Sequence, residues 1–369
     1  ANGGVLISFL KDKKNFKIKN KKLNIKGNFN KIRLTVDEKD DLLLVKKLFE
    51  FFKPNIYFNY KEIANLYIKN KIFFKKNSHL KLNEGSILDK SQKMWRRANG
   101  VILGGNSLLS KNPNLYLPNK WPTYFSKAKG CKIWDLNKKQ YYDMSLMGVG
   151  TNILGYSNKE VDDAVKKAIN DSTVSTLNCF EEVLLAEKLI NIHSWADKVK
   201  FARTGGEANA LAVRIARAAS GKEKVAFCGY HGWHDWYLAA NLKSNRILDN
   251  HLIKGLSPLG VPKSLKKTAY GFSYGNYDQL LKIVNKENIG IIKMEVCRNT
   301  SPNIKFLKQV RNLATKKNII LIFDECTTGF RENFGGIHLL TKVIPDLAIF
   351  GKALGNGYPI TAVIGKDEI

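Results

Sequence analysis

The sequence predicts an α/β protein built around a largely parallel sheet. After Gly155, helical and strand patterns alternate along the chain, which is typical of parallel strands joined by crossover helices. The strand segments are short apolar runs, as expected of strands that are buried in a sheet. The 369 residues are 44% hydrophobic and 25% charged, an ordinary globular composition that leaves room for two or three domains.

Residues 1–90 form the first predicted region and are rich in lysine. Residues 32–36 alternate as a strand does, and Asp37 can cap a helix whose apolar residues recur at helical spacing from Leu42 to Phe51. A second amphipathic stretch follows at 60–68. Because so few apolar residues make a poor core, this region is expected to be the tail of a larger unit.

Residues 91–155 form a second region, ahead of a main domain at 156–369. We expect a helix over 91–98, a break at Gly104 and Gly105, and a hairpin over 132–143. Within the main domain, helices are expected over 161–169 and 182–190, and strands over 199–202, 224–228, 289–295, 319–323 and 346–350.

The formal net charge of +29 suggests binding to a polyanion, but the types of basic residue and their distribution along the chain do not. Only 10 of the 61 basic residues are arginine, the residue that reads bases and clamps phosphates, and the lysines are dispersed. We therefore expect solvated lysine faces and no nucleic-acid partner. A non-catalytic basic binding module stays open as an alternative class of function.

The five cysteines form no CxxC pair and no zinc spacing, so neither a disulfide framework nor a metal site is expected. No apolar run reaches the roughly 18 residues of a membrane span, and the start lacks the order of a signal peptide. These features predict a reducing, cytoplasmic compartment and no membrane partner. The chain is also expected to be a fragment at both ends.

A phosphate cradle is predicted where the strand at 199–202 runs into a helix. The connection contains Thr204, Gly205 and Gly206, and two glycines allow a ligand to approach the backbone closely. The start of the helix adds free N–H groups and the positive end of the helix dipole. The alternative is a strand-to-helix turn that holds nothing.

Other chemistry-bearing side chains also follow strands, at the sheet edge where ligands collect in open α/β folds. Tyr230 and His231 follow one strand and offer a stacking ring and an imidazole, although His231 alone could equally be a structural histidine. Asp324 ends an apolar strand, and Lys352 follows the next strand. One crossover fits the 28 residues between them, so Asp324 and Lys352 should share an edge of the sheet.

The phosphate cradle, the aromatic ring, the carboxylate and the lysine are together what the chemistry of pyridoxal 5'-phosphate requires. A lysine holds the aldehyde as a Schiff base, and a carboxylate keeps the ring nitrogen protonated so that the ring accepts electrons. A helix N-terminus neutralises the phosphate, and an aromatic ring stacks on the cofactor. The combination is far more specific than any one of its members.

Four segments, FARTGGEANA, GYHGWHDW, LIFDECTTGFR and FGKALGNGYPI, resemble successive motifs of class III (fold type I) aminotransferases, most of all the glutamate-1-semialdehyde aminomutase branch. The resemblance covers about residues 91–369 and implies the large domain of that fold, with the small C-terminal domain past residue 369. It also implies a homodimer. The cofactor-binding residues that it implies are Thr204, Gly205, Gly206, Tyr230, His231, Glu295, Asn299, Asp324, Cys326 and Lys352.

The resemblance assigns a role to several of these residues. Lys352 would carry the cofactor and move protons, Asp324 would pair with the ring nitrogen, and Tyr230 would stack on the ring with Cys326 on the opposite face. It implies transfer of an amino group, with glutamate as the usual donor.

The sequence departs from the aminomutase pattern at Ser110, where the aminomutases have an arginine that grips the substrate carboxylate. Arg298 is a weak substitute for it. We therefore expect an aldehyde or ketone acceptor, a sugar among the candidates, with the aminomutase reaction as the alternative.

Residues 31–52, KIRLTVDEKDDLLLVKKLFEFF, are similar to the closing strand and helix of cytidylyltransferases that activate acidic sugars. Asp37 matches an aspartate that helps to hold magnesium in that family. A plain strand followed by a helix cap is the alternative. The resemblance implies that a larger polypeptide joins sugar activation to amine transfer, as in the synthesis of surface polysaccharides.

Overall fold

The computed structural model describes residues 29, 32–36, 38–80, 89–144, 147–171, 174–244, 246–251, 254–297 and 299–369. These divide into two compact units. Unit 1 contains the residues up to 127 together with 134–140, and unit 2 contains 128–133 and 141–369. Asp37 and Arg298 lie outside the described residues, so their predicted roles stay predictions.

The helices predicted in unit 1 are confirmed. The predicted segments correspond to α2 (Lys39–Phe52), α3 (Tyr60–Lys69) and α5 (Lys90–Val101). Its described residues also form the short 3-10 helices η1 (Lys71–Asn77), η2 (Leu109–Lys111) and η3 (Pro113–Leu115). A small apolar cluster joins α2, α3 and η1; its buried members are Leu44, Leu48, Ile63, Leu66 and Phe74.

The strand predicted over 32–36 is wrong, because these residues have irregular backbone. The Arg33 side chain turns inward and pairs with Asp41 of α2, with Nε 2.9 Å from Oδ1 and Nη2 2.9 Å from Oδ2. Asn77 donates a hydrogen bond to the Arg33 carbonyl oxygen and another to Asp41. Among the described residues, a buried ion pair with α2 and no neighbouring strand therefore holds this segment.

The predicted hairpin is confirmed as β2 (Lys132–Asp135) and β3 (Gln140–Tyr142), which join β1 (Phe125–Lys129) in a small sheet of order β1-β2-β3. The central sheet of unit 2 has the order β4-β10-β9-β8-β7-β5-β6. Its strands are β4 (Lys198–Ala202), β5 (Lys224–Cys228), β6 (Ala269–Gly271), β7 (Ile289–Glu295), β8 (Ile320–Asp324), β9 (Leu347–Phe350) and β10 (Thr361–Gly365).

The sheet is mostly parallel, as predicted. The pairs β6–β5, β5–β7, β7–β8 and β8–β9 are parallel, whereas β10 runs antiparallel to both β9 and β4. The helices around it are α6 (Met147–Gly150), α7 (Lys159–Asp171), α8 (Phe180–Ile192), α9 (Gly205–Ser220), α10 (Asp235–Leu238), α11 (Tyr277–Lys286), α12 (Ile304–Lys316) and α13 (Ile337–Thr341). The described part of the unit also contains the short 3-10 helices η4 (Ala239–Leu242), η5 (Ile247–Asn250), η6 (Lys263–Leu265) and η7 (Lys352–Gly355).

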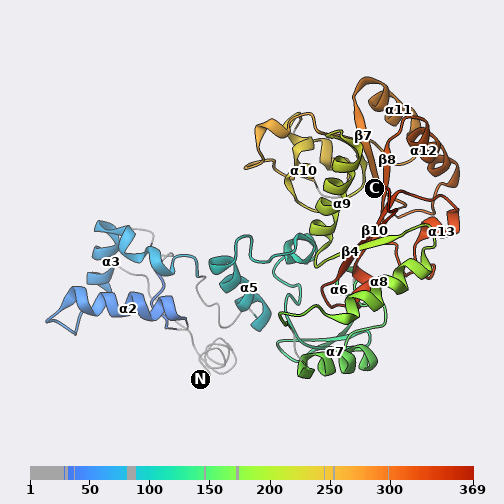
Figure 1. Ribbon diagram of the computed structural model, residues 1–369. Coiled ribbons are helices and arrows are strands. Elements are labelled where there is room, and N and C mark those ends of the chain that lie inside the picture. Colours follow the sequence, from blue (N-terminus) through green and yellow to red (C-terminus); the bar gives the residue numbers. More distant parts are fainter. Residues whose placement is uncertain are drawn as a thin grey trace. The chain divides into compact units, whose positions relative to one another are not determined.

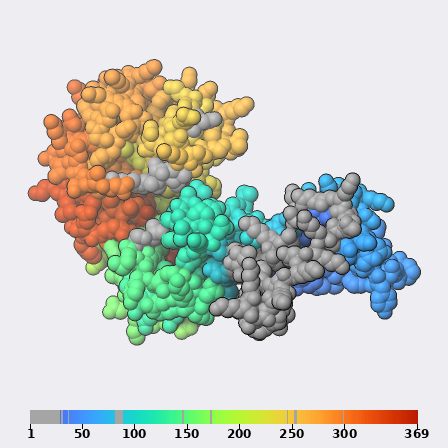
Figure 2. Space-filling model, turned by 180° about the vertical axis from the view of Figure 1, so that it is seen from behind, coloured from blue at the N-terminus to red at the C-terminus, as the bar shows by residue number. Residues whose placement is uncertain are grey.

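Helices cover both faces of this sheet, so successive strand residues enter two different cores. Ile291 and Ile322 pack with α9, whereas Ile292 and Phe323 pack with α11 and α12. Figure 1 shows α9 on one side of β7 and β8 and the α11–α12 pair on the other. In Figure 2 the orange segment that contains α11 and α12 forms a continuous surface. The carboxyl ends of the strands therefore remain as the edge where side chains can meet a ligand.

No helix in the described ranges has both the length and the apolar character needed to cross a bilayer.

Candidate active site

Asp324 and Lys352 end neighbouring parallel strands, as their spacing predicted. Asp324 is the last residue of β8 and pairs in register with Ile349 of β9, three residues before Lys352. Asp324 is only 3% exposed. Lys352 is half-buried, has a positive φ of 44°, and its Nζ donates a hydrogen bond to Thr327 Oγ1 at 3.0 Å.

The Asp324 carboxylate is surrounded by groups that favour its ionised form. His231 Nδ1 lies 2.8 Å from Oδ2, the backbone N–H of Cys326 donates to Oδ1 at 3.1 Å, and Lys293 Nζ lies 3.7 Å from Oδ2. Burial by itself raises the pKa of Asp324, but the Lys293 charge and the hydrogen bond from His231 outweigh it and hold the pKa well below its ordinary value. The carboxylate is therefore ionised at neutral pH.

His231 is a partner of Asp324 in this structure. Its side chain is buried, and Nε2 lies 3.1 Å from the carbonyl oxygen of Cys228. Burial and then the Lys293 charge lower the pKa of His231 to about 4. The imidazole is thus neutral at neutral pH and orients the carboxylate.

Tyr230 and Glu295 also come together. The backbone N–H of Tyr230 donates a hydrogen bond to Glu295 Oε2 at 3.1 Å, and Glu295 is buried at the end of β7. Glu295 therefore fixes the loop that presents the half-buried Tyr230 ring. Asn299 lies exposed in the turn after β7, with a left-handed φ of 57°.

The predicted phosphate cradle has the form of a capped helix start. Thr204 is the N-cap of α9: its hydroxyl accepts a hydrogen bond from the Glu207 N–H, and Glu207 Oε2 accepts from the N–H groups of Arg203 and Thr204. The N–H groups of Gly205 and Gly206 take no part in this box and stand at the positive end of a 16-residue helix. They can hold an anion.

The loop after β5 closes over this helix start. A Cβ on Gly206 would lie 2.8 Å from His234 Cε1, and a Cβ on Gly232, whose φ is 93°, would lie 3.1 Å from the Gly206 Cα. The buried His234 Nδ1 has no hydrogen-bond partner among the described residues. A glycine-lined helix start beside an unsatisfied imidazole nitrogen fits the phosphate of pyridoxal phosphate, and Asp324 and Lys352 fit its ring nitrogen and aldehyde.

Cys326 lies next to the start of α9, since its Sγ is 3.7 Å from the Cβ position of Gly205, and its contact with the cofactor ring stays a prediction. Burial and the Asp324 charge raise the pKa of the Cys326 thiol, so the thiol is neutral. Ser110 lies in η2 of unit 1, and its relation to the site stays a prediction.

Sequence reasoning missed three side chains at this site: Lys293, Thr327 and His234. The signal for Lys293 is visible in hindsight, because a lysine interrupts the apolar run of β7 two residues before Glu295. Thr327 and His234 carry no comparable signal. In the described ranges no three His, Cys, Asp or Glu side chains gather as a metal site would require.

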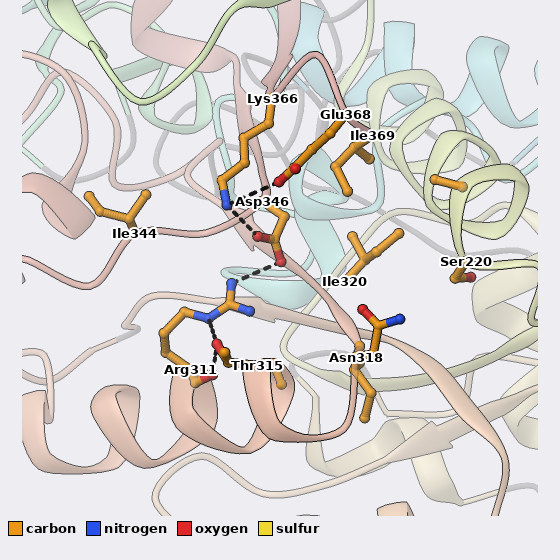
Figure 3. Close-up of a pocket in the computed structure, with 13 residues that line it drawn as sticks. Ser220, Arg311, Thr315, Asn318, Ile320, Ile344, Asp346, Lys366, Glu368 and Ile369 are labelled. Atoms are coloured by element: carbon orange, nitrogen blue, oxygen red, sulfur yellow. Dashed lines mark hydrogen bonds and ion pairs between the residues drawn. The ribbon is translucent and has the colours of Figure 1, made fainter.

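A cavity of about 570 Å³ lies at the opposite edge of the sheet (Figure 3). Ile320 at the start of β8 and Asp346 just before β9 line it. Asp346 is already bound there, since Arg311 Nη1 lies 2.8 Å from Oδ2 and Lys366 Nζ lies 3.0 Å from Oδ1. Its charge is compensated within the fold, and the cavity is not part of the candidate site.

Comparison with known proteins decides the family. A family model described as aminotransferase class III matches residues 117–369. The chain belongs to the class III aminotransferase family. This family depends on pyridoxal phosphate, as the sequence predicted.

Among the relatives, the chain is 33% identical over 290 residues to a 3-aminobutyryl-CoA aminotransferase of Cloacimonas acidaminovorans and 32% identical over 290 residues to a glutamate-1-semialdehyde 2,1-aminomutase of Methanocaldococcus jannaschii. Each match covers 76% of this chain and 66% of the relative, so the chain spans just under two thirds of their length.

Among solved structures, the FumI protein of Sphingopyxis sp. MTA144, in its PLP internal aldimine form, matches with a TM-score of 0.67 at 24% identity, over 76% of this chain and 65% of that chain. The family match confirms the predicted family, and the structural match confirms the predicted fold type I large domain. The family match begins at residue 117, and the predicted kinship of residues 1–90 with cytidylyltransferases stays a prediction.

Proposed function

We propose that the complete protein is a pyridoxal-phosphate-dependent aminotransferase that takes an amino group from glutamate and delivers it to an aldehyde or ketone. The observation that carries the proposal is the placement of an ionised, buried Asp324 and of Lys352 at the ends of adjacent parallel strands, beside the uncommitted start of α9. When bound, the cofactor supplies an aldehyde that accepts the amine and a ring that accepts electrons.

Each residue of the candidate site would have a separate role in holding the cofactor or moving a proton. The N–H groups of Gly205 and Gly206 would hold the phosphate, and Tyr230 and Cys326 would contact the two ring faces. Asp324 would keep a proton on the ring nitrogen. The Lys352 amine would hold the cofactor, and once displaced by the donor amine it would move a proton on and off the substrate carbon as base and acid.

The acceptor is proposed from Ser110. Since no arginine stands there, a substrate carboxylate loses a bidentate partner, which favours an acceptor that has no such group, and a sugar is compatible with residues 1–90. Glutamate-1-semialdehyde aminomutation is the second candidate, because aminomutases stand among the relatives.

Two incubations of the full-length protein separate the candidates. With glutamate alone, an aminotransferase converts the bound cofactor to its amine form and releases 2-oxoglutarate. The change in cofactor absorbance measures this conversion. With glutamate-1-semialdehyde, an aminomutase forms 5-aminolevulinate. We expect the first result and not the second, and efficient formation of 5-aminolevulinate would establish the aminomutase instead. Lys352→Ala is the control, and it should give neither product nor a borohydride-reducible adduct.

A further inference from the structure

A lysine lies fully buried beside the candidate active site. Lys293 is the fifth residue of β7 and is 0% exposed. It shares a face of the strand with Glu295, two residues on, because side chains alternate along a strand. The neighbouring strand β8 places Ile322 opposite Lys293 and Asp324 opposite Glu295, so Lys293 and Asp324 are diagonal neighbours.

The Lys293 ammonium has an ion pair but no hydrogen bond among the described residues. Its Nζ lies 3.7 Å from Asp324 Oδ2 and is one of the buried polar atoms without a hydrogen-bond partner. Burial lowers the pKa of Lys293, and the charge of Asp324 is the main effect that opposes it. A buried cation with no hydrogen bond is costly, and Asp324 is the group that offsets the cost.

The Asp324 carboxylate carries the negative charge of the site, and more than one partner competes for it. Lys293 and His231 both face Oδ2, at 3.7 and 2.8 Å. The ring nitrogen of the cofactor, when protonated, brings a further positive charge to the same carboxylate. Two cations near one carboxylate repel each other, so each makes the other harder to keep protonated.

We propose that Lys293 is a positioning residue that acts through Asp324: Lys293 and the ring nitrogen of the cofactor are alternative partners of the Asp324 carboxylate. This rests on the proposed function, because it assumes that Asp324 meets the ring nitrogen. The lysine stabilises the cofactor-free site by neutralising Asp324. The same ion pair between Lys293 and Asp324 lowers the affinity of the site for pyridoxal phosphate.

The test is the affinity of the full-length, cofactor-free protein for pyridoxal phosphate, titrated by absorbance. Lys293→Met keeps the length and the burial of the side chain but removes its charge. We expect Lys293→Met to bind about tenfold more tightly, which corresponds to one pKa unit of relieved repulsion. The matched control is Lys282→Met on α11, which removes an exposed lysine and should bind like the parent.

The possible outcomes separate the inference from the function. Equal or weaker binding by Lys293→Met, with normal binding by the parent, overturns the role of Lys293 and leaves the proposed function intact. A parent that binds no pyridoxal phosphate overturns both. A gain in affinity is a result that simple damage to the fold does not produce.

A second measurement tests the pairing in the cofactor-free protein. The thermal midpoints of the parent, Lys293→Met, Asp324→Asn and the double variant form a cycle. We expect the loss caused by Lys293→Met to be smaller when Asp324→Asn is present, because a neutral amide needs no counter-ion. Strict additivity would mean that the two side chains do not interact, and it would overturn the inference. If Lys293→Met does not fold without cofactor, Lys293→Gln replaces it in both measurements.

Discussion

At the scale of single residues, the proposed chemistry depends on one buried carboxylate. Asp324 is held by an imidazole, a backbone N–H and an ammonium, and together they keep it charged although it is 3% exposed. A charged carboxylate can hold a proton on a ring nitrogen, whereas a neutral amide cannot.

Asp324→Asn should therefore separate binding from chemistry. The variant keeps Lys352 and the helix start, so we expect it to take up pyridoxal phosphate and to form a borohydride-reducible adduct. We expect its turnover with glutamate to fall by a factor of about 100 or more, because the ring no longer accepts electrons well. Cofactor absorbance and turnover measured on one preparation check this, and equal turnover in variant and parent would contradict the role of Asp324.

His231 should make the cofactor-free protein sensitive to acid. Its pKa falls from 6.5 to about 4 on folding, so the unfolded chain binds the proton more readily and stability decreases as the pH falls through this window. Between pH 7 and pH 5 we expect a loss of about 2 kcal/mol from this group. Asp324, whose pKa is lowered on folding, also contributes to the free energy of unfolding, and this contribution is lost only below about pH 4.

Urea unfolding at pH 7 and pH 5 measures the His231 effect. His231→Gln keeps a donor toward Asp324 but does not titrate, so its stability should change less between the two pH values than that of the parent. The same change in both proteins would show that His231 is not the group responsible.

At the scale of elements, the start of α9 depends on close backbone packing. Gly205 and Gly206 both lie in the first turn, but their surroundings differ. A Cβ on Gly205 would meet only Cys326 Sγ at 3.7 Å, an ordinary contact, whereas a Cβ on Gly206 would lie 2.8 Å from the His234 ring.

Gly206→Ala should therefore destabilise the protein, and Gly205→Ala serves as its matched control. We expect Gly206→Ala to lower the free energy of unfolding by about 1 to 3 kcal/mol, because the His234 loop must move, and to weaken binding of pyridoxal phosphate. Gly205→Ala should change the stability by less than about 1 kcal/mol, since alanine favours a helix. Denaturant unfolding and cofactor titration check both variants, and equal destabilisation by the two would contradict this packing.

At the scale of the whole molecule, α8 leaves a large part of its apolar surface uncovered. Phe180, Val183 and Leu184 are 68%, 58% and 55% exposed, and Leu189 is the buried residue of this helix. Exposed apolar patches on enzymes are frequently contact surfaces between subunits. We propose that this surface is a contact in the homodimer that the family resemblance implies.

Leu184→Glu should accordingly weaken a dimer of the complete protein. The matched control is Ile304→Glu on α12, since Ile304 is 46% exposed and α12 packs in a different apolar core from α8. Sedimentation should show a dimer for the parent and the control and an increased monomer fraction for Leu184→Glu. A monomeric, active parent would refute the shared interface.

The sequence alone determined four of the parallel strands, β5, β7, β8 and β9, but not the short β6, and it indicated the two residues on which the proposed chemistry depends. The apolar runs that became β7 and β8 were recognisable because they are short and buried, and Asp324 and Lys352 stood out because each follows such a run. Local alternation misled the prediction at 32–36, since the buried pairing of Arg33 with Asp41 depends on a helix elsewhere in the chain.

Only the tertiary structure decided which partners Asp324 has. The strand order places β7 beside β8, and the register then places Lys293 diagonally opposite Asp324, while the loop after β5 brings in His231. The antiparallel insertion of β10 between β4 and β9 was likewise absent from the sequence pattern. The spacing along a chain reports periodicity within one element, whereas the charge around a buried carboxylate depends on contacts between elements that are distant in sequence.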